Sequence, residues 1–182
     1  MADARTDSLN LDGELWRFAY TFYGGKGVSP ACLALQEALG IDVNFVLFGA
    51  YALVERGFLL NENDIGIIDN LVRDWRGEVV HTLRRLRTRL KSGPAPAPSS
   101  ATEPLRNRIK AAEIDAEQVE LAVMADWLDR QPPRPAAGAN AKSVPLAVAR
   151  HFAPDARFTS EVESALDTLA QAIREAITKK QS

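Results

Sequence analysis

The chain has little of the residues that build disulfides, metal sites and nucleophilic centres: of 182 residues, one is cysteine and two are histidine. A single cysteine excludes an intrachain disulfide, which fits a reducing compartment, although a secreted protein can also lack disulfides. No catalytic triad, metal-ligand spacing or cofactor loop can be read. The sequence therefore predicts no cofactor, metal or catalytic residue, and it favours a non-enzyme.

Long apolar runs are also absent. The longest, Phe45–Val54, contains Gly49 and stops at Glu55, which is too short to span a bilayer. The polar, acidic N-terminus has no basic segment followed by an apolar one, so no secretory signal is predicted. We therefore expect a cytoplasmic protein of bacterial type without a membrane span.

No charge of one sign dominates the chain. The formal net charge is −2, and the fractions of hydrophobic (46%) and charged (25%) residues are ordinary for a globular protein. A general attraction to polyanions is not predicted, so a local cluster must carry any argument for nucleic-acid binding. The length suits one domain, or a domain with an appendage.

Apolar residues recur at helical spacing almost throughout, and no run alternates with period two. This pattern predicts an all-α fold. Ser29 and Asp42 are expected to cap helices, Gly57 to end one, and Gly77 to mark a bend or a close helix contact. The expected helices are 12–23, 29–39, 42–56, 63 or 64–91, 105–128, 146–152 and 159–179.

Two segments rich in proline and alanine divide the chain. They are expected to be flexible linkers because they hold few residues to bury. The predicted organisation is a compact N-terminal four-helix unit at 12–91, a linker at 92–104, an amphipathic helix at 105–130, a linker at 131–143 and C-terminal helices at 144–180. The apolar seams after the first linker can dock back, self-associate or bind a partner helix.

Three polar residues, Gln36, Asp42 and Asn44, lie among apolar helices in the segment 16–48. Helix capping explains Asp42, and Asn44 falls in the first turn, where its side chain can bond local backbone. The alternative is a small polar pocket inside an apolar helical cage. The lone Cys32, with no basic neighbour in sequence, is expected to be a buried structural residue.

Five positive charges occur within eight residues at the end of the long predicted helix: Arg84, Arg85, Arg87, Arg89 and Lys91. Cations at a helix C-terminus stabilise the helix dipole, so a solvated helix end is the simplest interpretation. The functional alternative is a surface for a protein partner or for nucleic acid. No aromatic residue interrupts the cluster, so stacking of single-stranded bases is not indicated.

Two further patterns are weak. Glu78 and His81 have the E-x-x-H spacing of di-iron helical bundles, but the second copy that such a site needs is missing. Gly24–Gly27 with Lys26 could form an anion nest, yet the P-loop spacing is absent. We expect a solvated histidine and a tight helix connection.

The string FY…GV…ACLALQ…G.DVN..LF, with Trp16 before it and W…VV..LR.LR..LK from Trp75 to Lys91 after it, resembles an uncharacterised proteobacterial family, a domain of unknown function. The resemblance covers about residues 15–91, and the segment Ala111–Leu121 resembles a later helix of that family. His81 departs from the family, which typically has proline there. The resemblance implies an all-α fold and a bacterial cytoplasmic setting, and it supplies no activity.

These observations favour a non-enzymatic interaction or regulatory helical module, which binds a protein partner or itself through the helical seams. The alternative is a small-ligand-binding protein or enzyme with a pocket around Gln36, Asp42 and Asn44. Nucleic-acid binding through Arg84–Lys91 is the weaker alternative, because the net charge is acidic.

Overall fold

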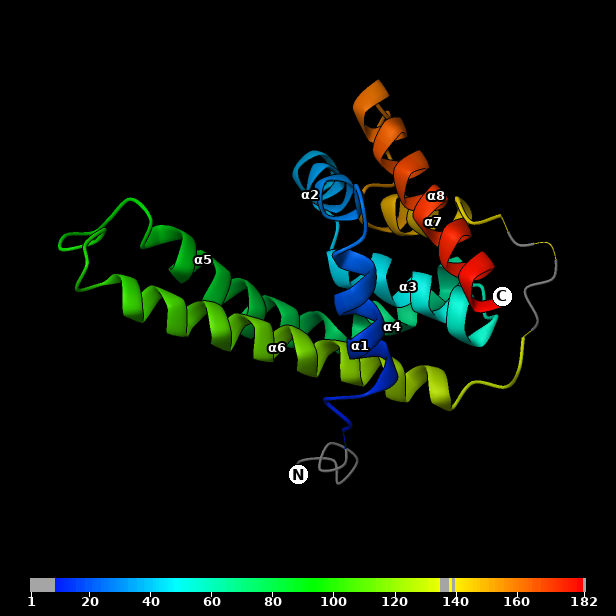
Figure 1. The fold of residues 1–182 in the computed structure, drawn as a ribbon, viewed down its shortest axis with the longest axis horizontal. Coiled ribbons are helices and arrows are strands. Elements are labelled where there is room, and N and C mark those ends of the chain that lie inside the picture. The colour runs from blue at the N-terminus through cyan, green and yellow to red at the C-terminus, as the bar shows by residue number, and fades with distance from the viewer. Residues whose placement is uncertain (1–8, 135–137, 139, 182) are drawn as a thin grey trace.

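The structure is a computed structural model that describes residues 9–134, 138 and 140–181. Within these ranges the regular elements are helices (Figure 1), so the predicted all-α class is confirmed. They are α1 (Glu14–Tyr23), α2 (Val28–Leu39), α3 (Val43–Arg56), α4 (Glu62–Trp75), η2 (Arg76–Val80), α5 (His81–Arg89), α6 (Glu103–Asp129), α7 (Ser143–Phe152) and α8 (Ser160–Gln181).

The central helix is α3, which is apolar on nearly every side and buries most of its length. Asp42 caps it by accepting a hydrogen bond from the Asn44 backbone N–H at 2.9 Å. Gly57 ends it in the left-handed conformation at φ 60°. Both helix signals agree with the sequence prediction.

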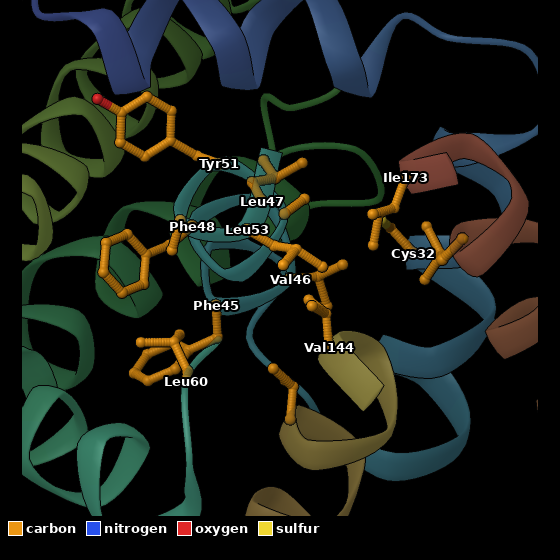
Figure 2. Packing of buried hydrophobic residues seen from close by; sticks show 14 of the residues in the cluster. Cys32, Phe45, Val46, Leu47, Phe48, Tyr51, Leu53, Leu60, Val144 and Ile173 are labelled. Atoms are coloured by element: carbon orange, nitrogen blue, oxygen red, sulfur yellow. The ribbon is translucent and has the colours of Figure 1, made fainter. Parts of the chain in front are cut away.

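The other helices surround α3, and residues of α1, α2, α4, α6, α7 and α8 join it in one hydrophobic core. Figure 2 shows Val144 of α7 and Ile173 of α8 on one side of α3, next to its side chains. The α2 helix packs along α8 and carries the fully buried Cys32. Burial raises the pKa of the Cys32 thiol to about 12, which disfavours the reactive thiolate. The buried position agrees with the prediction.

Most helix starts lie within one or two residues of the prediction, α7 starts three residues earlier, and the caps of α2 and α4 differ from those expected. The α2 helix begins at Val28 with Gly27 as its N-cap at φ 78°, and Ser29 makes no capping bond. The earlier start places Val28 in the core, where it is buried. The α4 helix is capped by Asn61 rather than starting at Asn63 or Asp64, because Asn61 and Asp64 exchange reciprocal side-chain to backbone hydrogen bonds of 2.9 Å.

The long predicted helix is continuous but changes its winding: α4 runs into the π-helical segment η2 and then into α5. Gly77 lies inside η2, where an added Cβ would meet nothing within 4 Å. The prediction of a close helix contact at Gly77 is therefore wrong. Wider winding instead turns Arg76 into the interior, where it is buried.

Beyond η2 the chain leaves the body of the protein. The α5 helix runs antiparallel to the first half of α6, and the two project together as a hairpin (Figure 1). We call residues 81–113 the arm. None of the residues of α5, all of which the structure describes, is buried. The predicted linker 92–104 falls at the tip of the arm, between α5 and the start of α6.

The second predicted linker, 131–143, joins α6 to α7, and its residues 135–137 and 139 lie outside the described residues. Among the helices of the described ranges, none combines the length and the apolarity needed to cross a membrane.

Candidate functional site

Polar side chains gather where η2 passes α3 and α6, and they include two of the three predicted pocket residues. Asp42 and Asn44 lie together, and the Asn44 Nδ2 donates to Glu120 Oε2 of α6 at 3.0 Å. Gln36 is not part of this cluster, because it lines an open groove on the other side of Ile41. We call Asp42, Asn44, Asp69, Arg76, Glu120 and His151 the buried polar cluster.

Arg76 holds the cluster together. Its Nη2 donates to Asp69 Oδ1 at 2.5 Å, and its Nη1 lies 3.7 Å from Asp42 Oδ2. The guanidinium lies 5.5 Å from the ring centre of Phe45 and 5.3 Å from that of Phe152. Aromatic rings and two carboxylates thus replace the water that the buried charge has lost.

His151 completes this side of the cluster. Its Nε2 lies 3.4 Å from Asp69 Oδ2, and its ring stacks on Phe45. Burial raises the pKa of Asp69, but the hydrogen bond and charge of Arg76 outweigh it and leave that pKa below its ordinary value. Asp69 is therefore ionised and pairs with Arg76.

Glu120 is the most deeply buried member, with 1% of its surface exposed. Burial, with the neighbouring Asp42 carboxylate, raises the pKa of Glu120 to about 9. Glu120 therefore keeps its proton at neutral pH. Three atoms of the cluster, Asp42 Oδ2, Arg76 Nη1 and Glu120 Oε1, have no hydrogen-bond partner in the part of the chain that the structure describes.

The arm holds a second set of charges, and it includes all five predicted surface cations. Two of them turn inward: Arg84 donates to Glu113 Oε1 at 2.9 Å and to Glu117 Oε1 at 2.5 Å, and Arg87 donates to both carboxylate oxygens of Glu113. Burial raises the pKa of Glu113, but Arg87 and Arg84 outweigh it and bring the net pKa below its ordinary value. These pairs cross-link α5 to α6.

The other three cations of the cluster are exposed. Within residues 9–134, 138 and 140–181, Arg85, Arg89 and Lys91 have no carboxylate partner. Arg85 bonds only the hydroxyl of Thr82, at 2.8 Å. These side chains remain available to a ligand in solution.

An open groove of about 650 Å³ runs along the root of the arm, between the end of α2 and α5. Its lining is basic and rich in donors, and among the described residues no carboxylate contributes to it. The lining consists of Gln36, Gly40, Ile41, His81, Arg84, Arg85, Thr88, Arg89 and Ser92. Burial lowers the pKa of His81, and the neighbouring arginines lower it further against the attraction of Asp42.

A smaller cavity of about 400 Å³ lies between α1, α3 and α6. Several of its polar groups pair with one another, since Arg56 contacts Asp129 at 2.6 Å and Tyr51 donates to Glu14 at 3.3 Å. Internal pairing leaves fewer free groups for a ligand than the groove at the arm offers.

The weaker sequence patterns form no site in the structure. No group of three or more His, Cys, Asp or Glu within the described residues has the geometry to hold a metal ion, so the E-x-x-H pair stands alone. Gly25 and Gly27 form a tight connection between α1 and α2, in which the Val28 N–H donates to the Gly25 carbonyl at 3.2 Å.

Sequence reasoning missed most of the buried charges. Asp69, Arg76 and Glu120 were not candidates, because the apolar seam of each helix was taken to be its buried face. One signal was present: Glu113, Glu117 and Glu120 recur at four and three residues along a predicted helix, which places three carboxylates on one face.

The fold and these sites define an all-α protein with a basic arm and a buried polar cluster. The chain belongs to the family described as a protein of unknown function (DUF2390), which matches residues 14–124. That match covers α1 to α6 up to Met124, and so includes the arm and most of the buried polar cluster. Neither a curated protein nor a solved structure gives a match to the chain.

Proposed function

We propose that this protein is a non-enzymatic binding module that docks on an anionic macromolecule through its arm. The observation that carries the proposal is the separation of charge. The arm contains eight Arg and Lys residues and two Glu, a formal net charge of +6, while the whole chain carries −2. The rest of the chain therefore carries −8.

The position of these charges supports docking. The arm projects from the body and α5 buries none of its residues, so the arm contributes little to the hydrophobic core. A large anionic partner can reach the charges of the projecting arm without any rearrangement of the core. The acidic remainder of the chain repels the same partner from the other surfaces. The arm thus sets the orientation of the complex.

The test is quantitative affinity purification from the native host, with and without nuclease, of three proteins. The arm variant carries Arg85→Glu, Arg89→Glu and Lys91→Glu. The control carries Lys26→Glu, Arg157→Glu and Lys179→Glu, which are exposed cations outside the arm. We expect a partner retained by wild type and control and lost by the arm variant. Equal recovery by all three proteins would remove the proposal.

A second function is favoured by a separate observation, the three unpartnered atoms of the buried polar cluster. The guanidinium of Arg76 and the protonated carboxyl of Glu120 supply donors and Asp42 supplies an acceptor, which suits a small polar ligand that both donates and accepts hydrogen bonds. Native mass spectrometry of protein from its own host would then show a bound mass that denaturation releases. A ligand-free mass would leave this second function unsupported.

A further inference from the structure

We infer that the groove at the root of the arm binds the phosphate backbone of double-stranded nucleic acid. This inference rests on the proposed function and names the class of its anionic partner. The groove presents the guanidinium groups of Arg85 and Arg89, and its lining also includes the imidazole of His81 and the guanidinium of Arg84, which is paired with Glu113 and Glu117. In a chain with more acidic than basic residues, a lining without a carboxylate among the described residues selects for anions.

Two outward-facing cations of the groove are spaced so that both can contact the phosphate backbone. Arg85 and Arg89 are one helical turn apart on α5, so their guanidinium groups lie on one face of the helix. Neither has a carboxylate partner in the described part of the chain. Guanidinium groups bind phosphate through two parallel hydrogen bonds, and the phosphate replaces water rather than an existing ion pair.

Neutral donors surround these cations. Gln36, Thr88 and Ser92 line the same groove, and amide and hydroxyl groups make many of the backbone contacts in protein complexes with nucleic acids. The arm carries further cations, because Lys91, Arg108 and Lys110 are exposed and make no ion pair in the described residues. A series of phosphates can meet several such cations, whereas a single small anion cannot.

The shape and chemistry of the groove favour a duplex over a single strand. The groove is open to solvent, and no Phe, Tyr or Trp of the described chain lines it. Single-strand binders use aromatic platforms on which bases stack. A groove that offers only cations and neutral donors contacts the phosphate backbone and not the bases. Binding is therefore independent of the nucleotide sequence.

The experiment measures fluorescence anisotropy of labelled DNA and RNA duplexes of about 20 base pairs, from about 50 to about 200 mM NaCl. The proteins are full-length wild type, an arm variant with Arg85→Gln, Arg89→Gln and Lys91→Gln, and a control with Lys26→Gln, Arg157→Gln and Lys179→Gln. Both variants lose the same charge. Glutamine keeps the helix propensity at Arg85 and Arg89, and Lys91 lies beyond the end of α5.

We expect the arm variant to bind at least about ten-fold more weakly than wild type and to flatten the slope of log K against log salt by about 3. The control should stay within about two-fold of wild type. The DNA and RNA duplexes tell which backbone is preferred.

Two results would overturn the inference. One is no binding of wild type to either duplex at about 50 mM salt up to about 100 μM protein. The other is equal loss in arm variant and control. If the duplexes do not bind but purification still returns a nuclease-resistant, arm-dependent partner, the proposed function stands and this inference falls. If neither measurement depends on the arm, both fall.

Discussion

Glu120 is the residue whose charge state most affects stability. Its pKa is raised in the folded protein to about 9, while an unfolded glutamic acid ionises near about 4.3. Between these values the folded state holds a proton that the unfolded state has released. The contribution of Glu120 to stability is therefore fully present below the unfolded pKa and is lost as the pH rises towards the folded pKa.

Glu120→Gln isolates this effect. Glutamine keeps an acceptor for Asn44 and supplies permanent N–H donors next to Asp42, and it cannot ionise. We expect the variant to gain stability over wild type as the pH rises from about 5 to about 9, by up to about 1.4 kcal/mol per pH unit. Urea unfolding curves across this range measure the difference. Parallel stability profiles would show that Glu120 ionises normally.

Gly49 is a packing residue, and a matched glycine shows its role. A Cβ at Gly49 would lie 2.8 Å from Val144 Cγ1, whereas a Cβ at Gly66 of α4 meets nothing within 4 Å. Gly49→Ala should destabilise by about 1–3 kcal/mol through overpacking. Gly66→Ala should stabilise by up to about 1 kcal/mol through helix propensity. Chemical denaturation of both variants tests the pair, and equal effects would contradict the close approach of α3 and α7.

For single residues, the roles that could be predicted from the sequence were those that depend on nearby residues in the chain. Asp42 caps the start of α3 and Gly57 ends it, as expected, because capping depends on neighbours a few residues away. The role of Asp42 beside Arg76 and Glu120 could not be predicted, since these residues are 34 and 78 positions further along the chain. Their contact depends on how η2 and α6 pack.

The arm is the element with the clearest internal bonding. Glu113 accepts hydrogen bonds from both Arg84 and Arg87, and these contacts join α5 to α6 where no buried residue of α5 does so. A carboxylate that two arginines share holds the two helices in register. The cross-link also leaves Arg85 and Arg89 on the outer face.

Glu113→Ala should therefore loosen the arm. The two arginines are partly exposed, so the cost is smaller than for a fully buried pair, about 1–2 kcal/mol. We expect amide hydrogen exchange in α5 to speed up by roughly five- to thirty-fold, with α3 unchanged. The control is Glu103→Ala, which removes an exposed pair with Arg106 and should leave α5 unchanged. An equal response to both variants would show that the cross-link contributes nothing.

Among the elements, helices were predicted well because the apolar period recurs in each. Most starts differ from the prediction by one or two residues, and that of α7 differs by three. The π-helical winding at η2 was not predicted. It accompanies the burial of Arg76 between Asp69, Asp42 and two aromatic rings, a tertiary contact that a local pattern does not record.

At the scale of the whole molecule, the hydrophobic core and the excess positive charge lie in different parts of the chain. Core residues come from α1 to α4 and α6 to α8, while the excess positive charge lies on the arm. The net charge of the full chain does not show this separation. Composition alone therefore made nucleic-acid binding the weaker alternative. Only the hairpin geometry shows that cations of α5 and of the first half of α6 lie on one projecting structure (Figure 1).

Removing the tip of the arm tests this division directly. Deletion of residues 89–110, with Thr88 joined to Ala111 through a Gly-Ser connection of about four residues, keeps Arg84, Arg87 and Glu113. None of the deleted residues belongs to the described hydrophobic core. We expect one cooperative thermal transition within about 5 °C of wild type, together with loss of duplex binding, because Arg89, Lys91, Arg108 and Lys110 leave with the tip. A large fall in Tm would show instead that the arm supports the core. Intact duplex binding would show that the deleted cations are not needed and that the contact lies on the retained part of the groove or on the body.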